Sequence, residues 1–310
     1  MFRSKIKKYT LQVFFMIEVL TGSCQEKNSL LTGGADLYET PEFKKYWYAG
    51  NAEINAYNLN QSRYSENRAG KAVLIFVSED FSKNKQVKLD DPAKAGSDKV
   101  NVLKMNFTKN FITGIYPYSM MLSVFTPVDH NRNANSLKAS MSSQEWCGHV
   151  FSQLNLKGSN YEVKSYSYFE EQSDVDFVIK KMLLEDEIWN IIRIDHKALP
   201  TGSIEVVPGL FFTRLKHVPL KPQRATALKT ETSTIITYVV DFLEQERKLS
   251  IRFEKKFPFK ILGWEETFKE RDTVQHTTAT LDKTMIIEYW TKNKIEFEYL
   301  RDSLHLPHPQ

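Results

Sequence analysis

Hydrophobic and polar residues alternate along much of this chain, in short segments separated by turn-forming residues. Residues 161–169 alternate in this way, whereas residues 72–77 (Ala-Val-Leu-Ile-Phe-Val) form a continuous apolar run. The first pattern is typical of a strand with one buried face, and the second of a strand buried on both faces. Further strands are predicted at 234–242, 248–253, 259–268, 274–281 and 284–290, with connections short enough for hairpins at 244–247 and 281–283.

One segment has a helical period instead. Between residues 175 and 193 the apolar positions follow helical spacing, and residues 185–187 (Glu-Asp-Glu) fall on another face. Asp174 or Ser173 is placed to cap the start of this helix. A long run of antiparallel strands with one main helix predicts a mainly β protein, built on a large curved antiparallel sheet or an incomplete barrel.

The first 24 residues follow a different pattern from the rest. Four basic residues within 3–8 precede a mostly apolar run at 9–20, and small residues then lead to Cys24. This order is typical of a secretory signal peptide, and the run is shorter than the roughly 20 residues that span a bilayer. The cysteine after the small residues resembles the lipobox of bacterial lipoproteins, which implies acylation at Cys24. An amphipathic helix at the start of a cytoplasmic protein is the alternative.

Three regions are therefore expected. Residues 1–23 are predicted to be a signal peptide, residues 24–45 a tether, and residues 46–305 a single β-rich domain with a possible soft boundary near 220–231. The whole chain has a net charge of +4, but residues 1–23 carry four basic side chains and one acidic one. The 38 basic and 37 acidic side chains that remain are nearly balanced, which argues against a nucleic-acid partner. Hydrophobic residues at 41% are enough for a substantial core.

The densest combination of reactive side chains lies at residues 144–151. If this segment is one strand, then Glu145, Cys147 and His149 share a face. A thiol and an imidazole on one face are candidates for a nucleophilic pair or for part of a metal site. Against this, residues two apart on a strand lie roughly 6–7 Å from each other, too far for a direct hydrogen bond. The alternative is a packing role for Cys147 and a pocket-lining role for His149.

Aromatic residues gather in several segments and are candidates for lining an apolar ligand groove. The candidates are Trp47, Tyr116, Tyr118, Trp146 and Phe211. Filling the core of a β protein is the alternative role for the same residues. No dinucleotide, P-loop, zinc-protease or serine-hydrolase motif is present in the sequence, so no cofactor and no metal is expected.

Three segments carry a resemblance to a known family. They are residues 142–150 (Ser-Ser-Gln-Glu-Trp-Cys-Gly-His-Val), 110–119 (Asn-Phe-Ile-Thr-Gly-Ile-Tyr-Pro-Tyr-Ser) and 199–202 (Leu-Pro-Thr-Gly). The chain resembles, from about residue 46 to 266, a group of exported proteins of Bacteroidota, many of which begin with a lipoprotein leader. Members often carry the label "septum formation inhibitor Maf". The true Maf family are cytoplasmic nucleotide pyrophosphatases with a Ser-Ala-Ser-Pro-Arg-Arg motif, and no such run exists here.

A second resemblance is a pattern of strands rather than a motif. Residues 247–253 and 257–265 resemble the curved-sheet proteins of the LolA kind, which carry lipid or lipoprotein acyl chains. Such a likeness implies a fold and only weakly a function.

Three functions are consistent with these observations. The leading hypothesis is a non-enzymatic, lipid-anchored envelope protein, on the periplasmic side of a membrane or at the cell surface, that binds a lipid, glycan or envelope protein on an apolar concave face. The second is an envelope hydrolase or metal-dependent enzyme that uses Glu145, Cys147 and His149. The third is the nucleotide pyrophosphatase of the Maf label, which the missing motif and the leader disfavour.

Overall fold

The computed structural model describes residues 36–130 and 134–308 of the chain. Fifteen strands form one sheet: β1 (Ala52–Arg63), β2 (Glu66–Ser82), β3 (Lys99–Thr113), β4 (Tyr116–Pro127), β5 (Lys138–Glu145), β6 (Gly148–Lys157), β7 (Asn160–Ser167), β8 (Val175–Lys180), β9 (Leu183–Leu184), β10 (Gly202–Val207), β11 (Gln223–Glu231), β12 (Ile235–Phe242), β13 (Arg247–Glu254), β14 (Ile261–Glu270) and β15 (Thr273–Ile287). The helices are α1 (Pro41–Trp47), α2 (Ile188–Asp195), α3 (Leu210–Lys216) and α4 (Tyr299–Ser303).

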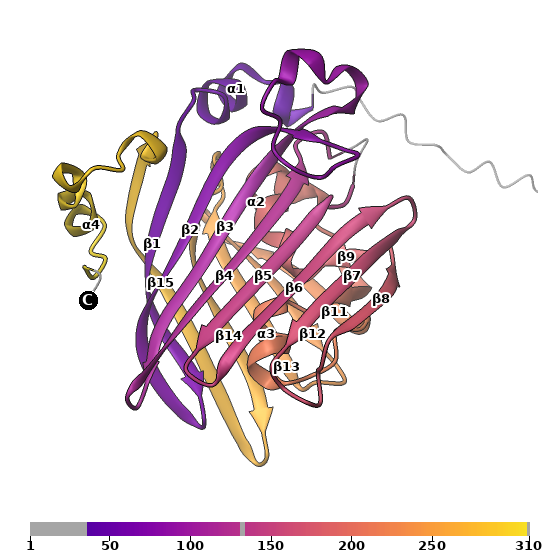
Figure 1. The fold of residues 1–310 in the computed structure, drawn as a ribbon, viewed down its shortest axis with the longest axis vertical. Coiled ribbons are helices and arrows are strands. Elements are labelled where there is room, and N and C mark those ends of the chain that lie inside the picture. Colours follow the sequence, from indigo (N-terminus) through magenta and orange to yellow (C-terminus); the bar gives the residue numbers. More distant parts are fainter. Residues whose placement is uncertain (1–35, 131–133, 309–310) are drawn as a thin grey trace, which may run out of the picture. The chain divides into compact units, whose positions relative to one another are not determined.

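Within each half of the sheet, the strands lie side by side in the order of the sequence. The strand order runs β8-β7-β6-β5-β4-β3-β2-β1-β15-β14-β13-β12-β11-β10-β9, so that β1 and β15 meet in the middle and β8 and β9 are the two edges. All neighbouring strands are antiparallel except β9 and β10. Short hairpins connect most of them, as at Tyr64 and Ser65, whose positive φ angles match the twist of the flanking strands. The predicted class, a mainly β protein with a large, curved, open sheet, is confirmed (Figure 1).

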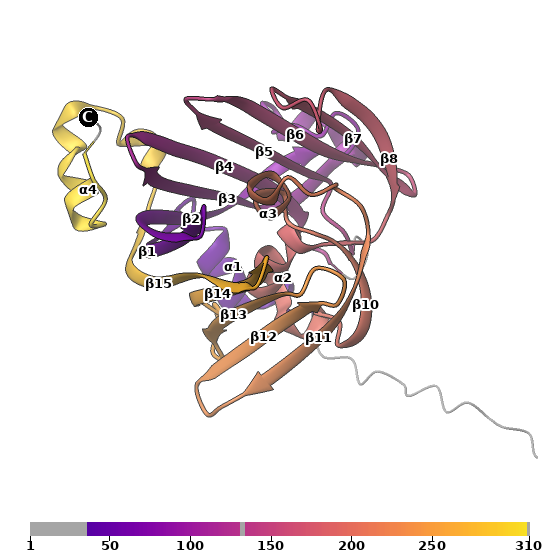
Figure 2. The same ribbon diagram turned by 90° about the horizontal axis from the view of Figure 1, so that it is seen from below.

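The curved sheet wraps around its own helices. α2 and α3 lie on the concave side, between the two halves of the sheet (Figure 2). Every residue of α2 from Ile188 to Ile194 is buried, as are six of the seven residues of α3. The buried side chains of these helices and of most strands form one hydrophobic cluster. Much of the concave face is therefore filled by the chain itself.

The predicted helix at 175–193 is wrong in its first half. Residues 175–180 form β8, in which Phe177 and Ile179 face inward, and the helical part is a 3-10 turn at Glu185–Glu187 followed by α2. A segment in which apolar and polar residues alternate is followed directly by one with helical spacing. The apolar positions of both segments together fit a single longer helix. Residues 185–187 are not a solvent-facing stripe either, because all three carboxylates are buried.

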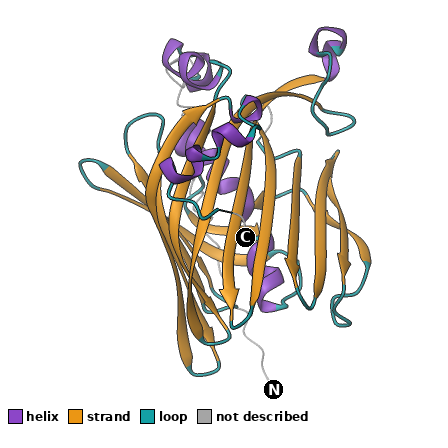
Figure 3. Cartoon of the chain, turned by 60° about the vertical axis from the view of Figure 1, so that its left-hand side comes forward, coloured by secondary structure: helices purple, strands orange, loops and turns teal. Residues whose placement is uncertain are grey.

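The convex face is covered in one place. The chain after β15 returns along the outer side of β1 and β2, where Leu304 and Leu306 pack against Ile54 and Val73 (Figure 3 brings this face forward). This cover explains why the continuous apolar run at 72–77 is buried on both faces, as predicted.

Two further expectations are corrected. The hairpin expected at 281–283 does not exist, because β15 continues through these residues and accommodates Asp282 as an extra residue opposite Ala56 and Tyr57 of β1. The folded body also begins before residue 46, since α1 buries Phe43. The described residues from Asp36 onward form one compact unit, and the soft boundary expected near 220–231 falls on β11, inside the sheet. The predicted signal peptide, Cys24 and the tether up to residue 35 lie outside the described residues.

Candidate functional site

The segment with Glu145, Cys147 and His149 is a hairpin, so the single strand expected at 144–151 is wrong. β5 ends at Glu145, Trp146 and Cys147 form the turn, and β6 begins at Gly148. Glu145 points inward and is buried, whereas Cys147 and His149 are exposed. The three side chains therefore do not share one face.

The Cys147 thiol lies in an environment that disfavours the thiolate. The negative charge of Glu145 raises the pKa of Cys147 above its ordinary value. Since the thiolate is the nucleophile of cysteine chemistry, this turn does not activate the thiol. Among the residues that the structure describes, no group of three or more His, Cys, Asp and Glu side chains could hold a metal ion.

We expect Cys147 to react with iodoacetamide in the folded protein, because it is exposed, and at a rate that keeps rising above pH 9. Mass spectrometry of the peptide that contains Cys147, after timed labelling from pH 6 to 10, measures this rate. A rate that already reaches its plateau below pH 7 would show an activated thiol and would support the enzymatic hypothesis.

The aromatic candidates occupy three different environments. Trp47 and Tyr118 are core residues, Tyr116 is half-buried next to Trp146, and Trp146 itself is 68% exposed at the hairpin turn. Phe211 of α3 is buried against Phe107. Of the five, only Phe211 borders a cavity described here, and that cavity is the smaller of two.

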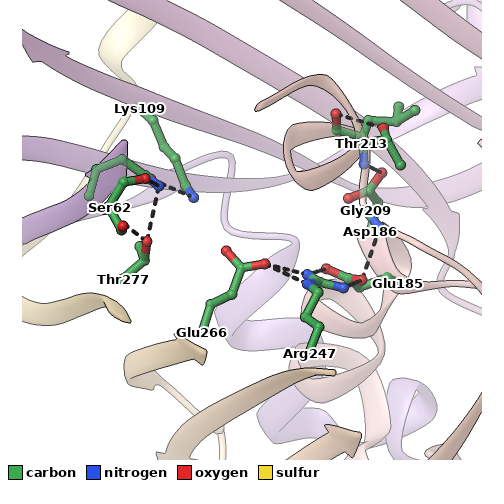
Figure 4. Close-up of polar contacts among 11 residues, drawn as sticks. Ser62, Lys109, Glu185, Asp186, Gly209, Thr213, Arg247, Glu266 and Thr277 are labelled. Carbon is green, nitrogen blue, oxygen red and sulfur yellow. Dashed lines mark hydrogen bonds and ion pairs between the residues drawn. The ribbon is translucent and has the colours of Figure 1, made fainter. Parts of the chain in front are cut away.

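The smaller cavity is surrounded by buried charges (Figure 4). Arg247 of β13 donates two hydrogen bonds of 2.6 Å to Glu185 and a third of 2.6 Å to Glu266 of β14. Although burial alone would raise it, Arg247 and Lys109 hold the pKa of Glu266 below its usual value. Such a pair is tolerated in a core only when nearly every lone pair and proton has a partner.

The two carboxylates before α2 also fix the start of α3. Glu185 accepts from the backbone N–H of Gly209 at 2.9 Å, and Asp186 accepts from that of Leu210 at 3.0 Å. Burial and then the neighbouring Glu185 raise the pKa of Asp186 to about 8. Asp186 is therefore protonated at neutral pH.

Lys109 completes the cluster from the other half of the sheet. Its ammonium group is buried, donates to Gln61 at 3.3 Å, and lies 5.4 Å from the centre of the Phe211 ring. Burial lowers the pKa of Lys109. The cavity between these groups measures about 30 Å³, which is room for roughly two water molecules. Charged residues from both halves of the sheet therefore face this cavity, which is too small to be a ligand site.

The larger cavity lies between β5–β8 and α3 with the chain that follows it. It measures about 540 Å³, within the range of small-molecule sites. Its apolar lining includes Met141, Val150, Phe177, Leu210, Val218 and Leu220. The Ser152 and Ser165 hydroxyls, which are hydrogen-bonded to each other at 2.8 Å, lie on the sheet side.

Two basic side chains line the same cavity: Arg214 of α3 and His217, which follows α3. Arg214 is buried and bonds to Glu145 at 2.8 Å, and its other terminal nitrogen lies 3.3 Å from Nε2 of His217. Glu171 and Asp176 line the cavity as well, and both are exposed. The larger cavity thus combines apolar side chains with polar ones from the sheet, from residues 171–176 and from the α3 region.

None of the residues that line the larger cavity is among the candidates named from the sequence, although Glu145 bonds to one of them, Arg214. The missed element is α3, whose signal is Pro208 and Gly209 before a short apolar run that ends in Arg214 and Lys216. No described helix is long and apolar enough to cross a membrane.

Comparison with known proteins adds a distant structural likeness. No family model matches the chain, and no curated protein matches its sequence. The chain is similar to a crystal structure of a beta-barrel-like protein of the domain of unknown function DUF1849 from Brucella abortus. The two share 8% sequence identity with a TM-score of 0.44, and the match covers 76% of this chain and 97% of the other. This likeness brings no family label, the Maf label included, and no function to the chain.

Proposed function

We propose that this protein is a non-enzymatic, lipid-anchored envelope protein that binds a small, largely apolar molecule in the larger cavity. The observation that carries the proposal is the cavity itself, which is about 540 Å³ in volume and has a lining surface that is mostly apolar. Pockets of this size and lining are the usual place of small ligands. α2 and α3 fill much of the remaining concave face, so the proposal names one part of that face rather than the whole.

The location rests on residues 1–24. The charged start, the short apolar run and the small residues before Cys24 support export and acylation. We expect the intact mass of the protein from its own cells to correspond to a chain that begins at Cys24 and carries acyl groups. An uncleaved, unacylated chain would contradict the envelope location, and nucleotide hydrolysis would then be the next assay.

The ligand site can be tested by filling the cavity. We expect Nile red, a neutral apolar dye, to bind the wild-type protein at one saturable site, and Ser165→Trp to weaken this binding at least tenfold. Ser165 faces the cavity from β7, where an indole would occupy the space of the ligand. Glu162→Trp is the matched control, because Glu162 lies on the opposite, exposed face of the same strand.

Fluorescence titration of the three proteins measures the dissociation constants, and circular dichroism checks their fold. Equal affinity of the Ser165→Trp and wild-type proteins, or no binding to either, would overturn the proposed site. The hydrolase or metal-enzyme hypothesis stays a prediction, and the hairpin geometry does not favour it.

A further inference from the structure

Arg214 and the residues around it indicate which class of ligand the larger cavity accepts. We infer that the ligand is a single-chain amphiphile with one acidic head group, a carboxylate or a phosphate monoester, and that the head group binds beside Arg214. This inference rests on the proposed function and deepens it, because it names the chemical class of the molecule.

The guanidinium of Arg214 has one hydrogen-bond donor without a partner among the described residues. Arg214 is only 2% exposed and lines the cavity. One terminal nitrogen bonds to Glu145, and the other lies next to His217. The Nε–H group, by contrast, is buried and has no hydrogen-bond partner among the described residues. A buried donor without a partner is unusual and calls for an acceptor, which a ligand in the cavity can supply.

The buried charges around the end of α3 are not balanced. Arg63 of β1 is also buried, and it donates to the Leu215 carbonyl and to the hydroxyls of Tyr118 and Tyr64. Its bonds to other described residues include no carboxylate. Lys216 has its own partner, Glu270, at 3.2 Å. Arg63 and Arg214 therefore face one buried carboxylate, that of Glu145, and one positive charge is left over.

His217 follows α3 in a left-handed conformation and lies beside Arg214. Burial, and then the charges of Arg214 and Arg63, lower the pKa of His217. The imidazole is therefore neutral at pH 7 and adds no further charge. Glu171 and Asp176, the other carboxylates that line the cavity, are exposed, so water screens them.

The rest of the cavity selects the other part of the ligand. The apolar part of its lining includes Val150, Phe177, Leu210 and Leu220, which offer an apolar chain no polar partner. An amine head group would meet the excess positive charge. A neutral alcohol would supply one weak acceptor and leave that charge in place.

Competition against Nile red tests the inference with four probes of equal chain length: laurate, lauryl phosphate, lauryl alcohol and laurylamine. Each is used below its critical micelle concentration. We expect laurate or lauryl phosphate to bind at least tenfold more tightly than lauryl alcohol, and laurylamine to bind more weakly than the alcohol. Ser165→Trp should weaken the binding of every probe.

Different results would refute the acidic head group and the ligand site itself. If the alcohol binds as tightly as both acids and Ser165→Trp weakens all of them, the cavity binds a ligand but the acidic head group is refuted. If no probe displaces Nile red, or if Ser165→Trp changes nothing, the proposed function fails first. The stronger of the two acids identifies the head group as a carboxylate or a phosphate.

A second variant locates the head group. Arg214→Met together with Glu145→Gln removes both members of the ion pair, so neither stays buried without the other, and Arg63, which does not line the cavity, keeps its own partners. We expect this double variant, if circular dichroism shows it folded, to bind laurate no better than lauryl alcohol, with its affinity for the alcohol unchanged. Arg224→Met removes an exposed arginine and serves as the control. A folded double variant that still prefers the acid tenfold would overturn the placement at Arg214.

Discussion

Arg247→Met should lower the free energy of unfolding by about 3–5 kcal/mol at pH 7, because it leaves two carboxylates buried without their cation. Glu185 and Glu266 both depend on this guanidinium, through three hydrogen bonds of 2.6 Å. Lys109 and Lys216 also lie near Glu266, but none of their described hydrogen bonds reaches either carboxylate. Urea unfolding followed by tryptophan fluorescence measures the loss. Since typical domains have about 5–15 kcal/mol in total, a partly unfolded population is expected even without urea.

The pH dependence of this variant identifies the cause. Without Arg247 the folded-state pKa of Glu266 should rise above its unfolded value, so the variant gains stability as the pH falls and Glu266 takes up a proton. The difference from wild type should therefore be smaller at pH 5 than at pH 7. Arg224→Met, at an exposed position, should change the free energy by less than about 0.5 kcal/mol. A loss as small as that for Arg247→Met would contradict the dependence of Glu185 and Glu266 on this guanidinium.

Asp186→Asn should have the opposite effect and stabilise the protein by about 2–4 kcal/mol at pH 7. The pKa of Asp186 is raised to about 8 in the folded protein, against about 4 in an unfolded chain. Between these two values the folded state binds a proton that the unfolded state does not, so this group lowers the stability as the pH rises. Asparagine stays neutral throughout, and its carbonyl oxygen can still accept from the Leu210 N–H, as Asp186 does.

The signature of this effect is its growth with pH. The advantage of Asp186→Asn over wild type should be small near pH 4, increase up to about pH 8 and then stay level. Urea unfolding of both proteins at intervals across this range measures it. An advantage that is independent of pH, or a loss of stability that grows with pH, would show that Asp186 is ionised in the folded protein.

The sequence pattern predicted the fold class well because strand periodicity is a local property. β7, β12, β13 and β14 lie within two residues of their predicted bounds. β8 was missed because Val175, Phe177 and Ile179 fit both an alternating strand and the helical spacing of the residues after them. Its pairing with β7 decided the outcome, and a local pattern does not contain that pairing.

The buried charges had a signal that alternation could have revealed. Arg247 shares the inward face of β13 with Leu249 and Ile251, and Lys109 lies between Phe107 and Phe111 on the inward face of β3. A cation at an apolar position of a strand indicates a buried partner. The identity of that partner was beyond reach, because Glu185 lies 62 residues from Arg247 along the chain. The larger cavity depends in the same way on where α3 packs against β4 and β5.

The central claim, that the larger cavity binds an acidic amphiphile, is tested most directly by a crystal structure with a fatty acid that carries bromine at the end of its chain. The account predicts a bromine anomalous peak between Val150 and Phe177, with the carboxylate within hydrogen-bond distance of Arg214 Nε. A cavity without bromine, or one closed by the protein's own side chains, would contradict it.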